Sequence, residues 1–220
     1  MSIKQNLQHI KSTLPEHVTL VAVSKTKPVS DLMEAYNAGQ RIFGENKIQE
    51  MADKHAEMPK DIEWHMIGHV QRNKVKYMAN FVSLIHGVDS FKLLQEINKQ
   101  AKKYDRTIDC LLQIKIAEED SKFGMSVNDA STLLQSDEFS ELKNIKVVGL
   151  MGMATFTDNM KQVEQEFNFL NSTFSDLKNS NPDLEIKSMG MSGDYQLAIN
   201  CGSTMIRVGS SIFGVRNYNK

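Results

Sequence analysis

Eight short runs rich in apolar and β-branched residues recur along the chain, and each is followed by a stretch of helical or turn-forming character. We expect these runs to be strands, and they lie at residues 18–24, 41–43, 63–68, 81–88, 107–116, 145–153, 184–191 and 204–214. Regular alternation of strand and helix favours a parallel sheet. Eight such units in 220 residues predict an α/β fold, a closed (β/α)8 barrel of the TIM type.

The expected helices fit this alternation. One precedes the first strand, and others are expected over 29–38, over 47–58, from 71, over 128–135, up to about 179 and over 195–200. An open flavodoxin-like sheet is the alternative, but it needs only five strands and leaves three runs unexplained. The chain shows no linker, short repeat or low-complexity stretch, so we expect residues 1–220 to form one domain.

Composition narrows the function classes. The formal net charge is −1, which gives no reason to expect nucleic acid or an anionic membrane as the main partner. No apolar run reaches the length of a membrane span, and residues 1–14 lack a signal-peptide core, so we expect a cytoplasmic protein. Cys110 and Cys201 are the only cysteines, and two isolated thiols make neither a disulfide framework nor a zinc site.

Polar or unusual residues close or follow the expected strands at the same end. They are Lys25, the segment 43–46, His69, His86, the segment 121–124, Met151, Ser192 and Arg207. In a (β/α)8 barrel the active site lies at the carboxyl ends of the strands, where these residues would meet. The pattern therefore predicts a site at that end of the barrel.

Lys25 directly follows the apolar run at 18–24. Apolar walls disfavour an ammonium ion, and a neutral amine is the form that makes a Schiff base with an aldehyde. Lys25 is therefore the candidate Schiff-base lysine, and a lysine that merely reaches into solvent from a strand end is the alternative. Lys27 is a rival for the role, although the adjacent Pro28 favours a loop position.

The last two expected strands carry a candidate phosphate site. Gly193 and Gly209 would let the backbone approach an anion closely, and Ser192 and Ser210 supply hydroxyls. The loops after strands seven and eight are the usual phosphate site of these barrels. Arg207 lies inside the eighth run, where an inward guanidinium could reach the nitrogen of a bound pyridine ring and disfavour its protonation.

The histidines are a weaker signal. His65 and His69 are four residues apart, but on a strand and a turn that spacing does not bring two ligands together, so we expect no metal site. His69 and His86 could instead line a cofactor cavity. Trp64 alternates with the inward residues of its strand and is expected to be a packing residue.

Several sequence blocks resemble the pyridoxal phosphate homeostasis protein family, whose barrel is similar to the N-terminal domain of alanine racemases. They are VAVSKTKP at 21–28, FGENKIQE at 43–50, WHMIGHVQRNK at 64–74, SKFGM at 121–125, GLMGM at 149–153 and the stretch at 189–214. The resemblance implies that pyridoxal 5′-phosphate (PLP) is the cofactor, with Lys25 as the Schiff-base lysine. It also implies Ser192, Gly209 and Ser210 at the phosphate, Arg207 at the pyridine nitrogen, and Asn46, His69 and Met151 near the ring.

The resemblance further implies a protein that buffers or delivers PLP in the cell, with transient apo-enzyme partners and no reaction of its own. A small PLP-dependent racemase is the alternative. A racemase of this type needs a second base, a tyrosine from an additional β-domain, and neither Tyr195 nor Tyr218 has a matching context. We expect no such domain here. In racemases the second base crosses from the partner subunit and so requires dimerisation, and without it we expect a monomer. A barrel for another phosphorylated metabolite is a third possibility.

Overall fold

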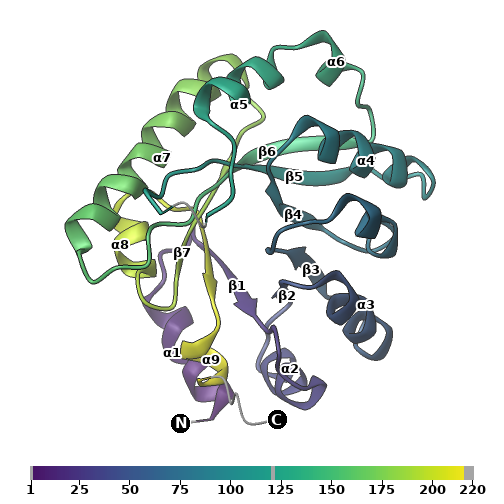
Figure 1. Ribbon diagram of the computed structural model, residues 1–220. Coiled ribbons are helices and arrows are strands. Elements are labelled where there is room, and N and C mark those ends of the chain that lie inside the picture. Colours follow the sequence, from purple (N-terminus) through teal and green to yellow (C-terminus); the bar gives the residue numbers. More distant parts are fainter. Residues whose placement is uncertain (1, 120–121, 216–220) are drawn as a thin grey trace.

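A computed structural model describes residues 2–119 and 122–215. Eight parallel strands form a closed barrel in sequential order, which confirms the expected fold (Figure 1). The strands are β1 (Thr19–Val23), β2 (Ile42–Glu45), β3 (Glu63–Met66), β4 (Leu84–Val88), β5 (Ile108–Gln113), β6 (Ile145–Met151), β7 (Ile186–Met191) and β8 (Met205–Val208). Hydrogen bonding between β8 and β1, with Thr19 opposite Met205 and Ala22 opposite Val208, closes the barrel.

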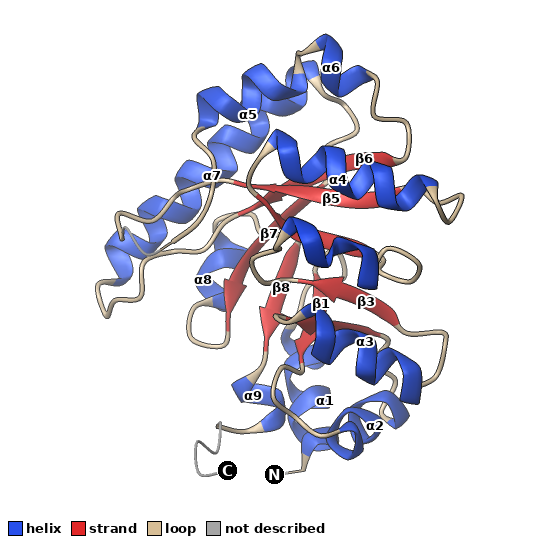
Figure 2. Ribbon diagram, turned by 45° about the vertical axis from the view of Figure 1, so that its right-hand side comes forward, coloured by secondary structure: helices blue, strands red, loops and turns tan. Residues whose placement is uncertain are grey.

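Helices surround the strands and cover the outside of the barrel (Figure 2). They are α1 (Ile3–Thr13), α2 (Val29–Asn37), α3 (Ile48–Glu57), α4 (Phe91–Lys102), α5 (Val127–Leu134), α6 (Asp137–Ser140), α7 (Met160–Ser180), α8 (Tyr195–Asn200) and α9 (Ser210–Phe213). A 3-10 helix, η1 (Arg72–Tyr77), connects β3 to β4. In the described part of the chain no helix combines the length and apolar character needed to cross a bilayer.

Several expected elements have other bounds in the structure, and three of the differences change the kind or the ends of an element near the barrel rim. The eighth run is not one strand, because β8 ends at Val208 and residues 210–213 turn into α9. The segment after 71 is a 3-10 helix, since only Val75 of its six residues is buried and it offers no apolar stripe for an α-helix. The second strand extends to Glu45, two residues beyond its expected end, and this places a carboxylate inside the sheet.

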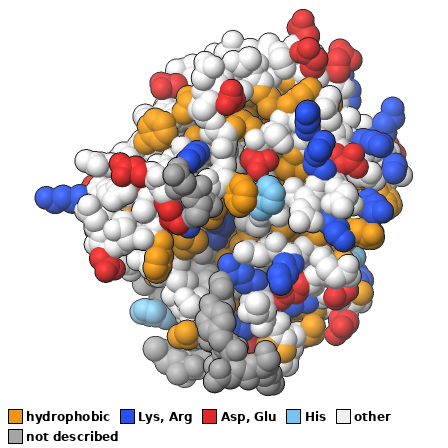
Figure 3. All heavy atoms as spheres, in the orientation of Figure 1, with side chains coloured by type: hydrophobic (Ala, Val, Ile, Leu, Met, Phe, Trp, Pro, Cys, Tyr) orange, Lys and Arg blue, Asp and Glu red, His pale blue; other side chains and the backbone are white. Residues whose placement is uncertain are grey.

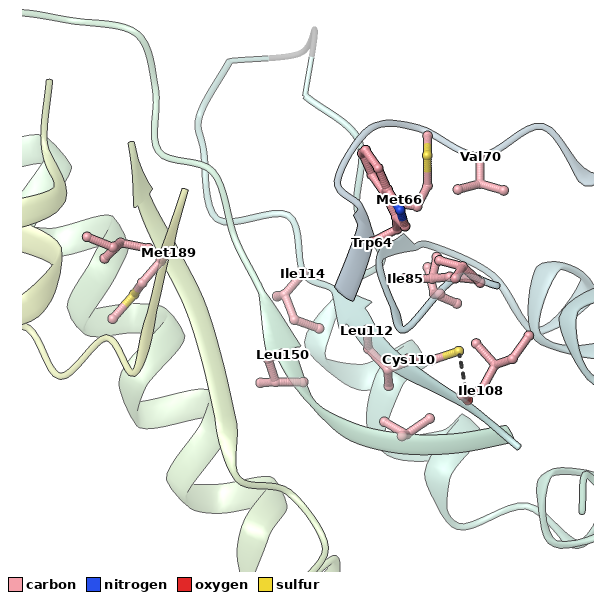
Figure 4. Packing of buried hydrophobic residues seen from close by; sticks show 14 of the residues in the cluster. Trp64, Met66, Val70, Ile85, Ile108, Cys110, Leu112, Ile114, Leu150 and Met189 are labelled. Atoms are coloured by element: carbon pink, nitrogen blue, oxygen red, sulfur yellow. Dashed lines mark hydrogen bonds between the residues drawn. The ribbon is translucent and has the colours of Figure 1, made fainter. Parts of the chain in front are cut away.

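Two hydrophobic clusters fill the fold. The larger joins the outward faces of the strands to the helices, and Figure 4 shows part of it around Trp64, Ile85 and Cys110. Trp64 is fully buried there beside Phe43, which confirms its expected packing role. The smaller cluster draws only on strands and their ends, and it fills the interior of the barrel. Its members are Val21, Val23, Ile67, Leu84, Leu111, Val148, Met151 and Met205.

The first helix fixes the last one. Ser2 and Gln5 form a reciprocal capping box that satisfies the amino end of α1. From the next position, Asn6 Nδ2 donates a 3.0 Å hydrogen bond to the carbonyl of Ile212 in α9. The turn between β8 and α9, where the phosphate site is expected, is thus supported by the amino-terminal helix through its contact with α9.

Close approach of β6 to β7 predicts a stability effect. A Cβ on Gly149 would lie 2.0 Å from the carbonyl oxygen of Ile186, its partner on the next strand. Because the close atom belongs to the backbone of the paired strand, Gly149→Ala should lower the free energy of unfolding by ~1–3 kcal/mol, the range of overpacked cores. Urea denaturation measures this. At Gly193 a Cβ would meet nothing within 4 Å, so Gly193→Ala is the matched control and should change stability by less than ~0.5 kcal/mol. Equal effects of the two substitutions would contradict this account of β6–β7 packing.

Candidate functional site

A cavity of about 540 Å³ opens at the carboxyl ends of β1, β7 and β8. Figure 3 shows this face of the molecule, where basic and hydrophobic side chains gather around a central hollow. The cavity is lined by Val23, Lys25, Lys27, Lys122, Ala154, Thr155, Phe156, Thr157, Asp158, Met160, Val163, Met191, Ser192, Gly193, Asp194, Arg207, Gly209, Ser210 and Gly214.

Five of the eight residues expected at the cofactor lie together in this lining: Lys25, Ser192, Arg207, Gly209 and Ser210. Strand closure explains the grouping, because β1 and β8 are hydrogen-bonded neighbours and β7 is the next strand. The chain segments that follow three adjacent parallel strands lie side by side at one end of the barrel.

The other three expected residues are not part of that lining. Met151 is buried in the interior cluster. Asn46 follows β2 and is half-buried. His69 stands further around the rim, where its Nδ1 lies 3.3 Å from Asp89 Oδ2 and its ring stacks on Phe123 at a centroid distance of 4.3 Å.

Lys25 occupies a tight turn at the end of β1. The Lys27 N–H donates to the Ser24 carbonyl at 3.1 Å and closes the turn around it. Thr26, directly after Lys25, has a φ of 65°, a conformation that β-branched residues rarely adopt. The Lys27 amine, the rival in sequence, also lines the cavity but donates to the Phe213 carbonyl at 2.8 Å. That bond holds Lys27 against α9.

The β7 and β8 turns are joined to each other. Gly209 N–H donates to Ser192 Oγ at 3.1 Å, which brings the two serine-bearing turns to one wall of the cavity. A Cβ on Gly209 would lie 3.1 Å from the carbonyl oxygen of Val23, so glycine lets the backbone pass close to β1. Gly193 has open space around it, and the packing gives no reason for glycine there.

Arg207 projects into the barrel from β8 and is 4% exposed. Its Nη1 donates to the Ser188 carbonyl at 2.8 Å and to Ser188 Oγ at 2.5 Å, and its Nη2 donates to the Gly152 carbonyl at 3.0 Å. Burial lowers the pKa of Arg207 to about 10, which leaves the guanidinium charged at neutral pH. The carboxylate of Asp194 favours that charged form.

Two buried histidines continue the hydrogen bonds of Arg207 across the barrel. His86 Nδ1 lies 3.0 Å from Ser188 Oγ, and His86 Nε2 lies 3.0 Å from His65 Nδ1. Burial lowers the pKa of His65 to about 3 and that of His86 well below its usual value, so both rings are neutral.

A guanidinium can only donate, so Ser188 Oγ accepts from Arg207. A serine oxygen can accept a second hydrogen bond or donate one, so both neutral tautomers of His86 fit its contacts with Ser188 Oγ and His65 Nδ1. The arrangement holds Arg207 in one orientation. From the sequence we expected His86 only as a possible cavity-wall residue. Its link between Ser188 and His65 could not be predicted, because these two residues lie on strands far apart in sequence.

The loop after β6 supplies lining residues that sequence reasoning did not select. Residues 154–158 cover one side of the cavity, and Phe156 is 93% exposed. Buried Glu166 on α7 holds this loop, since Thr155 N and Oγ1 donate to its carboxylate at 2.7 and 2.6 Å. Lys122 also lines the cavity and pairs with Glu119 at 3.2 Å. Ser121, in the segment singled out at 121–124, lies outside the described residues.

The described residues give no support for a metal. Within 2–119 and 122–215, no group of three or more histidine, cysteine, aspartate or glutamate side chains is placed to hold an ion. The His65–His86 pair instead lies in a hydrogen-bond chain that occupies its inward nitrogens.

Comparison with known proteins places the chain in a family. Residues 1–217 match the family model "Alanine racemase, N-terminal domain". The pyridoxal phosphate homeostasis protein of Pasteurella multocida (strain Pm70) is 41% identical over 226 residues, covering 99% of this chain and 96% of that protein. The structure of PipY from Synechococcus elongatus PCC7942 with PLP bound has a TM-score of 0.89 and 34% identity, covering 97% of this chain and 100% of PipY.

More distant structures share the fold alone. An alanine racemase of Clostridium difficile 630 superimposes with a TM-score of 0.80 at 16% identity, over 99% of this chain and 61% of the racemase. The barrel is thus common to both groups, whereas substantial sequence identity along the full length is shared with the homeostasis proteins. The chain therefore belongs to the pyridoxal phosphate homeostasis protein family.

Proposed function

We propose that this protein binds PLP at the cavity, with a Schiff base to Lys25, and that it keeps and hands on the cofactor rather than transforming a substrate. The observation that carries the proposal is the convergence of Lys25, Arg207 and the Ser192–Gly209–Ser210 wall on one cavity. Support comes from the relatives named as pyridoxal phosphate homeostasis proteins and from PipY, solved with PLP bound.

The cavity has the charge that a phosphorylated aldehyde requires. Its lining holds four basic side chains, Lys25, Lys27, Lys122 and Arg207, against the two carboxyl groups of Asp158 and Asp194. Burial raises the pKa of Asp194 above its usual value. An excess of cations around an apolar-walled space favours a dianionic phosphate on an aromatic ring.

Each proposed contact follows from the chemistry of the side chain. The Lys25 amine would attack the aldehyde carbon, so that a C=N bond forms and the carbonyl oxygen leaves as water. Gly209 and Ser210 backbone and the Ser192 and Ser210 hydroxyls would hold the phosphate. Arg207, which can only donate, would hydrogen-bond the pyridine nitrogen and keep it unprotonated. Asn46, His69 and Met151 are proposed to lie at the edge of the ring site.

A racemase is the second candidate, because the barrel superimposes on alanine racemases. The described lining of the cavity contains no tyrosine that could act as a second base. Tyr195 lies at the start of α8 and lines a neighbouring hollow with Asn6 and His9, and Tyr218 lies outside the described residues. An unprotonated pyridine nitrogen would also weaken carbanion stabilisation. These points favour a carrier, and we propose that it acts as a single-domain monomer in the cytoplasm.

The first prediction concerns the lysine. Reduction of the PLP-loaded protein with borohydride should fix pyridoxyl mass on the peptide that contains Lys25, and Lys25→Ala should remove the visible absorbance of the bound cofactor. Lys143→Ala is the control, because Lys143 lies outside the cavity lining. Peptide mass mapping measures the label. If most of it is found on Lys27 or Lys122 in the unaltered protein, the assignment to Lys25 is wrong.

The second prediction concerns the phosphate. Ser192→Ala or Ser210→Ala should weaken PLP binding by ~1–2 kcal/mol, the scale of one hydrogen bond to a charged group. Ser211→Ala is the matched control, since Ser211 is exposed and does not line this cavity. Pyridoxal, which lacks the phosphate, should bind far more weakly than PLP in a fluorescence titration. Equal affinities for PLP and pyridoxal would refute the phosphate site.

The third prediction concerns catalysis and assembly. The PLP-loaded protein, incubated with L-amino acids in deuterated water, should incorporate α-deuterium far below the rates of ordinary enzymes, roughly 1–1000 per second. The reason is that Lys25 serves only one face of a substrate. The same sample should sediment as a monomer at micromolar concentration. Deuterium exchange at an enzymatic rate would restore the racemase, and a stable dimer would overturn the proposed monomer.

A further inference from the structure

We propose that Glu50 and Lys54 on α3, together with Glu45 at the end of β2, are positioning residues for Lys25. They lie outside the cavity lining, so they would act through the backbone on either side of that lysine and not by touching a ligand. The inference deepens the proposed function and rests on it: it assigns the part of the protein that aims the Schiff-base amine.

The turn that carries Lys25 needs such support. Thr26 has a φ of 65°, and among the described residues Asp105 is the other non-glycine residue with a positive φ. In an L-residue a left-handed backbone is about tenfold less populated than a right-handed one, and a β-branched side chain is especially unsuited to it. The surroundings must therefore stabilise this conformation, since threonine does not favour it by itself.

Glu50 supplies the direct contact. The Thr26 N–H donates a 2.5 Å hydrogen bond to Glu50 Oε1, from the first turn of α3. Lys54, one helical turn further on, donates to the same Glu50 oxygen at 2.8 Å. The carboxylate that holds the strained residue is thus fixed by a lysine on its own helix.

Lys54 also binds the residue on the other side of Lys25. Its amine donates to the Ser24 carbonyl at 2.8 Å and to Glu45 Oε1 at 2.7 Å. With Glu50 this makes three acceptors, which is the full donor capacity of an ammonium group. The Lys54 side chain is only 7% exposed and that of Glu45 is fully buried, so these are interactions in a medium of low dielectric constant.

Ser24 is held twice more by β2. Its N–H donates to the Gly44 carbonyl at 3.0 Å, and its hydroxyl donates to Glu45 Oε1 at 2.6 Å. Burial raises the pKa of Glu45, while the Lys54 charge and the hydrogen bonds from Lys54 and Ser24 favour its ionised form. Both neighbours of Lys25 are therefore tied to one group of charges behind the barrel wall.

The consequence is preorganisation. Lys25 leaves the wall from a backbone whose flanking peptide groups are both fixed, so its amine starts from a narrow range of directions. Forming the bond to an aldehyde then costs less conformational entropy than it would from a mobile loop. If α3 releases the turn, Schiff-base formation should weaken while the phosphate wall of β7 and β8 stays intact.

Glu50→Ala tests this most cleanly. It frees the Thr26 N–H but leaves Lys54 paired with Glu45, so no buried charge is orphaned. We expect PLP affinity to fall about tenfold, the factor that corresponds to loss of a conformational preference of this size. Affinity for pyridoxine 5′-phosphate, which has the ring and phosphate but no aldehyde, should change less than twofold. Glu57→Ala, an exposed glutamate on the same helix, is the control and should leave both affinities unchanged.

A double-mutant cycle with Thr26→Gly distinguishes a positioning role of Glu50 from a general loss of structure. Glycine adopts a positive φ about as readily as a negative one, so Thr26→Gly lets the turn keep its shape with less help from Glu50. In a Thr26→Gly background, Glu50→Ala should therefore weaken PLP only two- to threefold. The cycle is read by PLP titration and by borohydride labelling of Lys25.

The outcomes are distinct. Selective loss of PLP affinity that Thr26→Gly reduces supports the proposal. Equal loss for PLP and pyridoxine 5′-phosphate, or a loss of the same size in both backgrounds, overturns it, because both results indicate damage beyond the Lys25 turn. No loss in Glu50→Ala also overturns it. Absence of Lys25 labelling in the unaltered protein instead refutes the proposed function on which the inference rests.

Discussion

Hydrogen bonding between β1 and β8 is the constraint on which the rest of the structure depends. It pairs residues 19–22 with 205–208 and so joins the two ends of the chain into a closed barrel. The same pairing sets Lys25, just after β1, beside the turns that follow β7 and β8. Without closure, the Lys25 amine would lie at one edge of an open sheet, and the Arg207 guanidinium and the serine-bearing wall would lie at the other. The candidate site is therefore a consequence of topology before it is a consequence of any one side chain.

Two groups of buried polar residues stabilise the charges that lie at the end of the apolar barrel. On one side, Arg207 is held by Ser188, Gly152 and the neutral histidine pair, which leaves its charge near the cavity in a fixed orientation. On the other side, Lys54 and Glu45 neutralise each other behind the turn of Lys25. Buried polar groups are stabilising only when their partners are satisfied. In the first group the partners come from strands on both sides of the barrel and the loop after β6, and in the second from β2 and α3, so the site residues are fixed by the same elements that form the barrel.

The sequence predicted the barrel, and it predicted that five of the candidate site residues would lie together. Continuous apolar runs identify buried parallel strands, and strand ends converge in a closed barrel, so Lys25, Arg207 and Ser210 could be grouped in advance. The boundary between β8 and α9 was missed because Ile212 and Phe213 resume an apolar pattern after the two serines, as a continuing strand would. The hydrogen-bond chain through His86 could not be predicted, since it depends on Ser188 and Arg207, which only the folded chain brings near. The Glu50–Lys54 spacing was visible, but its target, Thr26, becomes strained only in the folded turn.

We propose that one cavity holds PLP by its aldehyde at Lys25, by its ring nitrogen at Arg207 and by its phosphate at the β7 and β8 turns. A crystal structure of this protein grown with PLP would test all three contacts at once. We expect continuous electron density from Lys25 Nζ to the former aldehyde carbon. We also expect the Arg207 guanidinium within hydrogen-bond distance of the pyridine nitrogen and the phosphate against Gly209 and Ser210. Density joined to Lys27 or Lys122, or a phosphate bound away from those two turns, would contradict this proposal.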